Sequence, residues 1–372
     1  MIKVLYITNL PTPYRVKFFN QLGNKTELTV LYERSTANNR NSKWLENDGY
    51  SYKDIFMNGI KFKDDQALNF EVIKYINEFR DRIIIVGGYS TPTGMLAIYY
   101  MKMKGIKFII NADGGLIKQD SFFKYKLKSF LISSANYWLS SSRSTSEYLS
   151  HYGADINSTI EYSFSSVEKK NILKSPMSFI DKARLRKKLD INEEHIILYV
   201  GQMIHRKGID ILLESLIDKD ETIGVYLIGG GVLPEYEEII RNNSISNIYF
   251  IDFIPNNDLQ DYYKVADLFI LPTREDIWGL VINEAMAMGL PIITTKSCVA
   301  GLELVKNGVN GFLINSDNPE ELKVCYKEII RNDPLRRKMS NNSLSIIGYH
   351  TIENMVQQHL EFFSIYQQDT IV

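Results

Sequence analysis

The chain has 372 residues, of which 45% are hydrophobic and 23% are charged, a composition typical of about two globular domains and not of a disordered or fibrous protein. Its formal net charge of -1 excludes the basic excess of a dedicated nucleic-acid-binding protein, so we expect no nucleic-acid partner. The charge is uneven: residues 1–170 carry 23 basic and 16 acidic side chains, whereas the remainder carries 20 and 28. The first half therefore favours an anionic partner.

The cysteine content and the N-terminal sequence bear on the cellular compartment in which the protein is expected to act. Cys298 and Cys325 are too few for a disulfide framework or a cysteine-rich metal site, and they fit a reducing environment. Residues 1–10 hold one lysine and a short apolar run, which predicts a first strand and not a signal peptide. No apolar run reaches the roughly 18 residues that span a bilayer. We expect a cytoplasmic protein, soluble or peripherally attached to the inner face of the cell membrane.

In the first half of the chain, short runs rich in Ile, Val and Tyr alternate with longer segments of helical period. This alternation predicts a parallel sheet covered by helices. The pattern weakens between about residues 163 and 194, where we expect an interdomain linker. The expected strands are Lys3–Thr8, Leu28–Tyr32, Ile83–Gly87, Phe108–Asn111 and Tyr137–Ser140.

The alternation restarts near residue 196, as if from a first strand. We therefore predict an α/β protein with two Rossmann-like domains, at residues 1–170 and 171–350, and a C-terminal helix at 351–372 that packs back on the N-terminal domain. Ligands of open parallel sheets bind beyond the carboxyl ends of the strands, which places the expected site in a cleft between the domains. The expected strands are Ile196–Val200, Val225–Gly229, Ile248–Ile251, Leu268–Leu271 and Ile292–Thr295.

The most informative segment is residues 271–291, LPTREDIWGLVINEAMAMGLP. A strand ends at Leu271, and after a loop with two acidic residues a helix begins near Leu280, to be stopped by Gly-Leu-Pro. A helix N-terminus preceded by a glycine, here Gly279, lets backbone N–H groups approach a phosphate, aided by the macrodipole. Glu284 lies one turn along the face that leads to this N-terminus.

This segment resembles the acidic-x7-Glu signature of the retaining GT-B glycosyltransferases of family 4, or glycosyltransferase group 1. The resemblance implies that Glu284 binds the ribose of a nucleotide-sugar. It also implies that the amides of Gly279, Leu280 and Val281 hold the diphosphate. The first acidic position, which contacts the transferred sugar, falls on Asp276, where the family commonly has Glu. The alternative is an ordinary strand-loop-helix whose acidic residues are surface charges.

A second segment, residues 199–210 (YVGQMIHRKGID), carries adjacent cations directly after a strand. Gly201 permits close approach, and Arg206 and Lys207 are placed to neutralise a pyrophosphate leaving group. The segment resembles the family's Gly-Arg…Lys-Gly loop, in which an Arg and a Lys bind the diphosphate. Lys207 matches, whereas Gln202 replaces the Arg, so Arg206 is expected to compensate. The alternative is a solvated surface pair.

Two further strand ends match the family more weakly. The loop in LIGGGVLPE contains Gly230 and would border the diphosphate. It lacks the spacing of a dinucleotide fingerprint. The segment YFIDFIP resembles the loop whose backbone pairs with the nucleobase, which would give Phe253 and Ile254 that role. The alternative for these two residues is an ordinary place in the core.

In the N-terminal half, residues 8–19 (TNLPTPYRVKFF) resemble family openings of the Pro-x-Pro-Tyr-Arg type. Asn9, Tyr14 and Arg15 are therefore candidates for acceptor or phosphate contacts. Asp113 follows another strand, near where related enzymes often place a His, and its carboxylate would accept a hydrogen bond from a sugar hydroxyl. The alternatives are a rigid loop with Arg15 on the surface and a plain Asp-Gly turn.

Between residues 116 and 139, four lysines alternate with aromatic residues, at Lys118, Lys124, Lys126 and Lys128. A basic helix with aromatic residues can lie in an anionic membrane interface, which the charge of the first half also favours. The alternative is a surface helix with solvated lysines.

The resemblance implies a GT-B hexosyltransferase that moves a hexose-type sugar from a UDP- or GDP-sugar to a hydroxyl of a saccharide or lipid-linked saccharide, with retention. The expected setting is assembly of a cell-surface polysaccharide or O-antigen. Asp276, Glu284, Lys207 and Asp113 are the catalytic candidates. No cofactor and no metal is expected, since the family generally needs none and the five histidines lack ligand spacing.

Two alternatives to this function stay open. Gln202 and Asp276 depart from the family pattern, which favours a catalytically inactive nucleotide-sugar-binding protein of the same fold. An oxidoreductase on two α/β domains would need a glycine-rich turn after the first strand. Residues 8–15 hold two prolines and no glycine, which counts against it.

Overall fold

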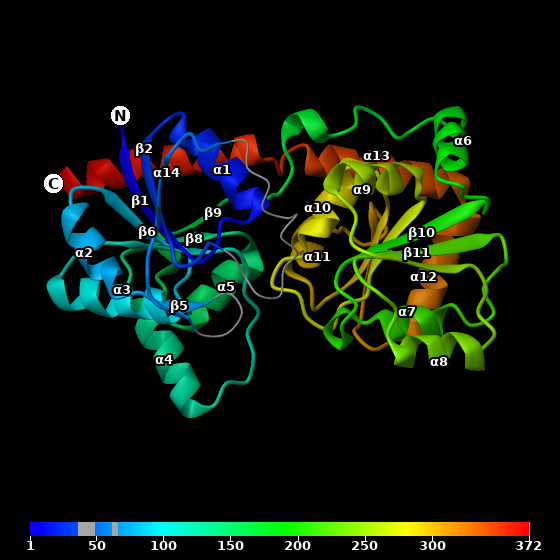
Figure 1. Cartoon of the computed structure of the whole chain (residues 1–372), viewed down its shortest axis with the longest axis horizontal. Coiled ribbons are helices and arrows are strands. Elements are labelled where there is room, and N and C mark those ends of the chain that lie inside the picture. Colours follow the sequence, from blue (N-terminus) through cyan, green and yellow to red (C-terminus); the bar gives the residue numbers. More distant parts are fainter. Residues whose placement is uncertain (36–48, 62–65, 372) are drawn as a thin grey trace. The chain divides into compact units, whose positions relative to one another are not determined.

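The computed structural model describes residues 1–35, 49–61 and 66–371, and it divides into two units. The first unit comprises Met1–Ser166 and Thr351–Val372, and the second comprises Val167–His350. Each unit is built on its own parallel sheet with helices packed against it (Figure 1). The predicted fold class, α/β with two parallel sheets, is confirmed.

The sheet of the first unit has the strand order β3-β2-β1-β6-β7-β8-β9, and all of its pairings are parallel. Most of its central strand β1 is fully buried, which suits a sheet covered on both faces. The strands are β1 (Lys3–Thr8), β2 (Glu27–Tyr32), β3 (Lys53–Phe56), β6 (Ile83–Val86), β7 (Ile109–Ala112), β8 (Tyr137–Ser140) and β9 (Thr159–Glu161), with a separate antiparallel pair β4 (Ile60–Lys61) and β5 (Ala67–Leu68).

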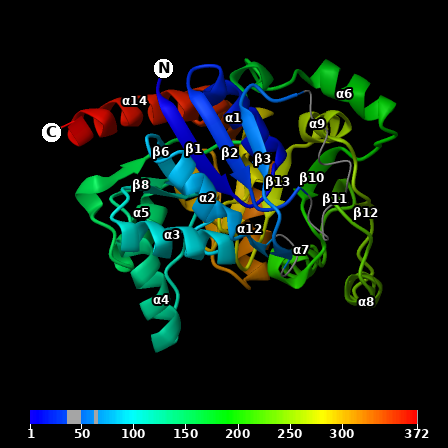
Figure 2. The same ribbon diagram turned by 60° about the vertical axis from the view of Figure 1, so that its left-hand side comes forward.

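The helices of the first unit begin and end at identifiable signals. The Thr91 side chain caps α3 by accepting the N–H of Gly94, and Gly105 ends it in the left-handed conformation. The C-terminal helix α14 lies beside α1 (Figures 1 and 2), where the His359 ring is 4.9 Å from the Phe18 ring. The helices are α1 (Pro13–Gly23), α2 (Glu71–Glu78), α3 (Pro92–Lys104), α4 (Phe122–Ser133), α5 (Arg143–His151) and α14 (Ile352–Ile371).

The sheet of the second unit has the order β12-β11-β10-β13-β14-β15, again with parallel pairings only. Its strands are β10 (His195–Val200), β11 (Ile223–Ile228), β12 (Ile248–Ile251), β13 (Leu268–Leu271), β14 (Ile292–Thr295) and β15 (Gly311–Ile314). Its helices are α6 (Phe179–Lys188), α7 (Ile209–Ser215), α8 (Pro234–Asn242), α9 (Asn256–Val265), α10 (Leu280–Ala287), α11 (Val299–Leu304), α12 (Pro319–Arg331) and α13 (Asp333–Ile347).

The strand order of the second unit creates a switch point. The chain runs from β10 outward to β11 and β12, and then returns to place β13 on the other side of β10. The loops after β10 and β13 therefore leave the sheet side by side, which is where open α/β sheets form ligand crevices.

The predicted strands agree closely with the structure, and β1, β8, β12, β13 and β14 have the expected bounds. Strands β3, β9 and β15 were not expected, because each mixes apolar residues with polar residues or glycine.

The segment expected as a linker contains α6, which is fixed to the second unit by charge. Its Lys182 and Arg186 side chains lie 2.9 and 2.6 Å from the carboxylate of Asp267, which is 7% exposed. Burial opposes ionisation of Asp267, but the two cations outweigh it and hold its pKa below the ordinary value.

Candidate functional site

The candidate residues of the second unit follow the carboxyl ends of four neighbouring strands. Gly201 to Lys207 follow β10, Gly230 follows β11, Phe253 and Ile254 follow β12, and the segment from Asp276 to Glu284 follows β13. These strands occupy consecutive places in the sheet, so the sequence-predicted donor residues share one edge of it.

An ion pair joins the two central loops. Lys207 Nζ lies 2.5 Å from Asp276 Oδ2, and the side chains are 12% and 11% exposed. Asp276 is therefore not a surface charge, and Lys207 is not a solvated lysine. A largely buried lysine and carboxylate in contact at a switch point form a polar site that can bind an anion through the remaining N–H donors of the lysine.

The backbone around Lys207 requires a glycine at the next position. Gly208 has a φ of 70°, and a Cβ atom there would lie 2.1 Å from the carbonyl oxygen of Pro272. This close approach presses the short 3-10 helix His205–Lys207 against the loop after β13. Lys207 therefore lies in a turn whose next residue, Gly208, has to be a glycine.

Arg274 holds the same two loops together with its side chain. Its guanidinium makes two bonds to Asp210, of 2.9 and 2.6 Å, and a 2.6 Å bond to Asp317, and Nη1 also donates to the His205 carbonyl at 2.7 Å. Burial lowers the tendency of Asp210 to ionise, yet the hydrogen bonds from Arg274 outweigh it and leave the pKa of Asp210 below its ordinary value.

Arg206 is exposed, and its side chain reaches across to the loop after β13. Its Nη1 donates to the Glu275 carbonyl at 2.6 Å, while its own carbonyl accepts the N–H of Arg274 at 2.9 Å. A guanidinium has five N–H donors, so an exposed Arg206 retains donors that an anion can reach.

The N-terminus of α10 lies next to Asp276. The first-turn N–H groups of a helix have no intrahelical acceptor, which leaves those of Leu280 and Val281 suited to an anion. Gly279 enters the helix at a φ of 100°, where a Cβ atom would lie 2.8 Å from Cys298 Sγ.

Glu284 is half-buried on α10, one turn into the helix. It accepts a hydrogen bond of 3.1 Å from the hydroxyl of Tyr263, a buried residue of α9. Burial raises the pKa of Tyr263 well above its ordinary value, and the carboxylate of Glu284 adds to the rise. Tyr263 therefore stays a donor and orients Glu284.

The glycines after β10 and β11 let their loops approach each other. A Cβ atom on Gly229 would lie 2.4 Å from the Gly201 carbonyl oxygen, and one on Gly230 would lie 3.3 Å from the Met203 side chain. Gln202 is exposed, and its carbonyl accepts the Tyr199 hydroxyl at 2.9 Å. The loop that begins at Gly201 is thus packed directly on the loop that contains Gly230.

Phe253 and Ile254 follow β12, which β11 and β10 separate from β13. Phe253 is exposed and Ile254 is half-buried, so the alternative that placed Phe253 in the core is wrong. An exposed aromatic side chain beyond a strand end offers a flat apolar surface to a planar ligand.

In the first unit, the carboxylate of Asp113 contacts two of the candidate residues that follow β1, Tyr14 and Arg15. Its carboxylate pairs with Arg15 and accepts the Tyr14 hydroxyl at 3.1 Å. Asn111 Nδ2 and the Tyr162 hydroxyl donate to its other oxygen at 2.9 and 3.1 Å. Asp113 is therefore more than an Asp-Gly turn, because it joins four side chains.

Arg15 is 4% exposed, so the alternative that placed it on the surface is wrong. Burial opposes its charge, but Asp113 outweighs the penalty and raises the Arg15 pKa well above the ordinary value. Its Nη1 also donates to the Tyr6 hydroxyl at 2.5 Å. Asn9 lies in the loop before this cluster, half-buried, and its carbonyl accepts the N–H of Arg34 at 3.1 Å.

Sequence reasoning missed three residues that hold the candidates in place. Arg274 stands inside the informative segment, but no spacing marks it. Tyr263 and Tyr162 come from distant parts of the chain, and no motif in their local sequence marks either tyrosine. Only the strand and helix packing brings these side chains to Glu284 and Asp113.

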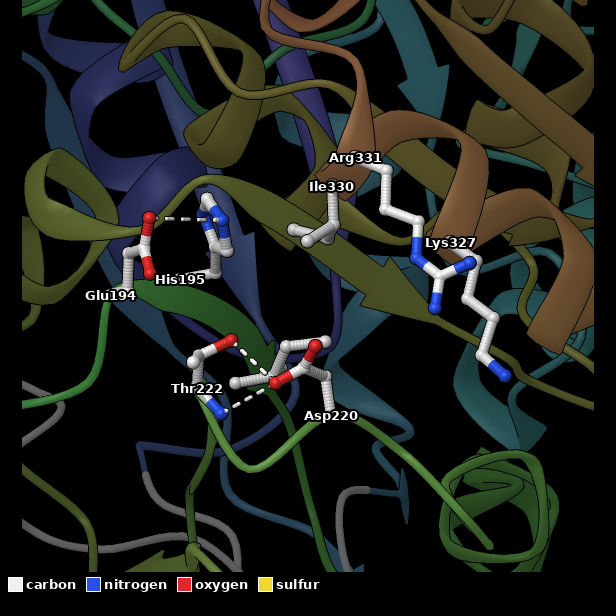
Figure 3. A pocket seen from close by; sticks show the side chains of 8 residues that line it. Glu194, His195, Asp220, Thr222, Lys327, Ile330 and Arg331 are labelled. Carbon is white, nitrogen blue, oxygen red and sulfur yellow. Dashed lines mark hydrogen bonds and ion pairs between the residues drawn. The ribbon is translucent and has the colours of Figure 1, made fainter.

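A hollow in the second unit lies at the opposite edge of the sheet. His195 and Ile223, at the amino ends of β10 and β11, line it together with Lys327 and Arg331 of α12 (Figure 3). Asp220 in its wall accepts two hydrogen bonds from Thr222 (Figure 3). None of the donor candidates lines this hollow.

Among residues 1–35, 49–61 and 66–371, no helix is long and apolar enough to cross a membrane. In the same described ranges, no three His, Cys, Asp or Glu side chains are grouped as a metal site would require.

Comparisons with known proteins agree with the resemblance. Residues 181–345 match the family model of the glycosyl transferases group 1. An uncharacterized glycosyltransferase of Methanocaldococcus jannaschii is 33% identical over 147 residues, 39% of this chain and 41% of that protein. The lipopolysaccharide glucosyltransferase WaaG of Escherichia coli is 26% identical over 164 residues, 42% of this chain and 43% of WaaG. The chain thus matches less than half the length of these relatives.

Similarity in structure extends over the whole chain. Crystal structures of Anabaena HepE, in complexes with UDP and with UDP-glucose, superpose with TM-scores of 0.77 and 0.76, covering 98% of this chain and 100% of theirs. At 16% identity this likeness concerns the fold, which is GT-B. The resemblance to glycosyltransferase group 1 is confirmed by the match over residues 181–345, within a chain of GT-B fold.

Proposed function

We propose that the protein transfers a hexose-type sugar from a UDP- or GDP-sugar to a hydroxyl of a saccharide or lipid-linked saccharide, with retention at the anomeric carbon. The setting we propose is the assembly of a cell-surface polysaccharide or O-antigen. The observation that carries the proposal is the contact of Lys207 with Asp276 at the switch point of the second sheet, beside the N-terminus of α10. WaaG, by its name a lipopolysaccharide glucosyltransferase, supports the setting.

In this proposal the main work of the site is to stabilise the departing diphosphate. Lys207 and Arg206 supply positive charge, and the amides of Leu280 and Val281 supply fixed N–H donors. The loop that carries the two cations is already held in place by Gly208 and Arg274, so little reorganisation of it accompanies the reaction. Asp276 keeps Lys207 oriented and contacts the transferred sugar.

The nucleoside would lie along the strand ends on either side of this centre. Glu284, oriented by Tyr263, would accept hydrogen bonds from the ribose hydroxyls. The backbone beside Phe253 and Ile254 would pair with the base. The HepE complexes with UDP and UDP-glucose support a uridine donor.

We propose that the acceptor saccharide contacts the first unit near Asn9, Tyr14 and Arg15. The hydroxyl of Tyr14 already donates to Asp113, so a sugar hydroxyl that reaches this carboxylate would share an oxygen with the resident donors. Asp113 then acts on the acceptor directly and through the orientation of Tyr14.

The first test is thermal unfolding with millimolar UDP, GDP, ADP, CMP or NAD. A nucleotide at 100 times its dissociation constant stabilises by about 2.7 kcal/mol, which raises the midpoint by roughly several degrees. The shift should vanish in Glu284→Ala and persist in Glu328→Ala, an exposed glutamate on α12. A shift with NAD alone, or with no nucleotide, would contradict the proposal.

Transfer itself needs a second measurement. The matching nucleotide-sugar is incubated with candidate saccharide acceptors, the product mass is measured, and the anomeric configuration is determined by NMR. Nucleotide binding without release of the sugar to acceptor or water would instead favour the inactive binding protein. Full turnover in EDTA is expected, because the proposed leaving-group contacts come from protein cations and amides.

A further inference from the structure

Helix α4 of the first unit carries exposed apolar residues in addition to buried ones. Leu131 and Ile132 are buried against the unit, and the Tyr125 hydroxyl donates to the His151 carbonyl at 3.3 Å. Yet Phe123, Leu127 and Phe130, spaced at i, i+4 and i+7, form a second stripe that faces solvent. A helix on the surface of a globular unit normally needs only one apolar face, so the exposed stripe calls for its own explanation.

The stripe continues onto the neighbouring helix. Tyr99 and Met103, one turn apart on α3, are 56% and 61% exposed, and the Tyr99 ring lies 6.5 Å from the ring of Phe130. Phe122 and Phe123 at the start of α4 are 68% and 83% exposed, with their rings 5.8 Å apart. We call Tyr99, Met103, Phe122, Phe123, Leu127 and Phe130 the α3–α4 surface. Adjoining exposed apolar side chains of this kind mark an interaction site, unlike apolar residues scattered singly.

Lysines are numerous in the segments that carry the α3–α4 surface, and Lys126 Nζ lies 5.6 Å from the centre of the Phe122 ring. Residues 99–135 contain seven lysines and two acidic residues, and six of the lysines are exposed: Lys102, Lys104, Lys107, Lys118, Lys124 and Lys126. Both acids are engaged by side chains of the same unit. Asp113 pairs with Arg15, and the side chain of Asp120 is 1% exposed, bonded to Lys124, Lys128 and Tyr152. The charge presented to solvent around the surface is therefore strongly positive.

From this geometry we infer that the α3–α4 surface inserts into the interface of an anionic lipid bilayer. Exposed Phe and Leu side chains enter the headgroup and acyl boundary, and the lysines of the same segments pair with lipid phosphates. In both views α4 projects from the rest of the first unit (Figures 1 and 2). The proposal concerns a surface of the first unit and does not depend on sugar transfer.

A second copy of the chain is a poorer occupant. A two-fold contact through the α3–α4 surface would bring the same lysines of both copies together, and residues 99–135 offer no exposed acid to neutralise them. An anionic bilayer supplies negative charge around an apolar interior, which matches the combination of lysines and exposed aromatic residues.

The test is flotation of the full chain with vesicles of phosphatidylcholine alone or with about 30% phosphatidylglycerol. Binding is expected only to the anionic vesicles and should weaken at 0.5 M compared with 0.1 M NaCl, on the order of the screening expected for surface charge. The double variant Phe123→Ser/Leu127→Ser should lower partitioning by about tenfold or more, given the apolar area removed. Lys104→Gln/Lys126→Gln should lower it by about fivefold per lysine.

Matched controls distinguish binding through the α3–α4 surface from nonspecific adsorption to the vesicles. Phe179→Ser on α6 removes a phenylalanine that is 82% exposed in the second unit, and Arg337→Gln/Lys338→Gln removes two exposed charges from α13. Both should bind as the wild type does. Every substituted side chain is exposed, so unfolding midpoints should be unchanged, and a nucleotide-induced shift should persist in all variants.

Three results would overturn the inference. The first is absence of the wild type from anionic vesicles, and the second is equal binding by Phe123→Ser/Leu127→Ser. The third is a dimer in sedimentation velocity that this double variant dissociates, which would assign the α3–α4 surface to a second copy.

Discussion

Replacing Lys207 by Met tests whether the ion pair with Asp276 organises the donor site. The Nζ–Oδ2 distance is 2.5 Å and both side chains are about nine-tenths buried, so the variant leaves a carboxylate with little solvent and no cation in contact. Breaking a buried pair by removing one partner costs about 3–5 kcal/mol, and the slight exposure here places the expected loss near ~3 kcal/mol. For a unit of this size, that lowers the midpoint by roughly 6–12 °C.

The assay is scanning calorimetry of four proteins: the wild type, Lys207→Met, Asp276→Asn and the double variant. If the pair interacts, the double variant loses less than the sum of the single losses, by at least about 1 kcal/mol. Lys338→Met, at an exposed lysine of α13, should leave the midpoint unchanged. Additive losses, or a single variant as stable as the wild type, would refute the reasoning.

The same variants separate a structural role from a binding role. Loss of charge-assisted hydrogen bonds to a diphosphate should raise the dissociation constant of the bound nucleotide by about ten- to a hundredfold in Lys207→Met. Asp276→Asn retains the lysine and should bind the nucleotide nearly as well as the wild type, while losing transfer. Isothermal titration calorimetry of the two variants distinguishes these outcomes.

Other contacts yield further predictions. Gly208→Ala should destabilise by about 1–3 kcal/mol more than Gly308→Ala, since both have a φ near 70° but only at Gly208 would the added Cβ atom overlap a backbone oxygen; equal midpoints would contradict this. Arg274→Met should cost about 2–4 kcal/mol in denaturant unfolding and weaken nucleotide binding, because it releases the loop that carries the lysine. Asp267 has a lowered pKa, so its contribution is present at neutral pH and lost as the pH falls below about 4. Unfolding of Asp267→Asn should therefore depend less steeply on acid pH than unfolding of the wild type.

The fold followed from the sequence because apolar runs of four to six residues recur with helical segments between them. Strands such as Lys3–Thr8 and Leu268–Leu271 are largely buried by their neighbours, so their apolar length is their structural length. Strand β15 (Gly311–Ile314) escaped prediction because it begins with a glycine and joins the sheet only by pairing with β14. Edge strands of this kind are defined by their neighbour more than by their own composition.

The candidate site was predictable only in part, because some of its features depend on neighbouring residues and others on contacts between distant parts of the chain. The position of α10 and its glycine can be inferred from local signals, since turns and helix starts depend on adjacent residues. The contact of Lys207 with Asp276 joins residues 69 apart and exists because β13 lies beside β10, an order that no local pattern specifies. Tyr263 and Arg274 act through the same long-range packing. The roles of these residues in catalysis stay predictions.

The return of α14 to the first unit also sets an order of folding during synthesis. The second unit is continuous, from Val167 to His350, and all its residues are made before α14 appears. The first unit lacks α14 until Ile352–Ile371 has been synthesised, so the Phe18 ring stays uncovered by His359 during that interval. Although domains usually finish from the N-terminus onward, here the later unit can complete its core first. Premature termination within α14 would then leave a finished second unit attached to an incomplete first one.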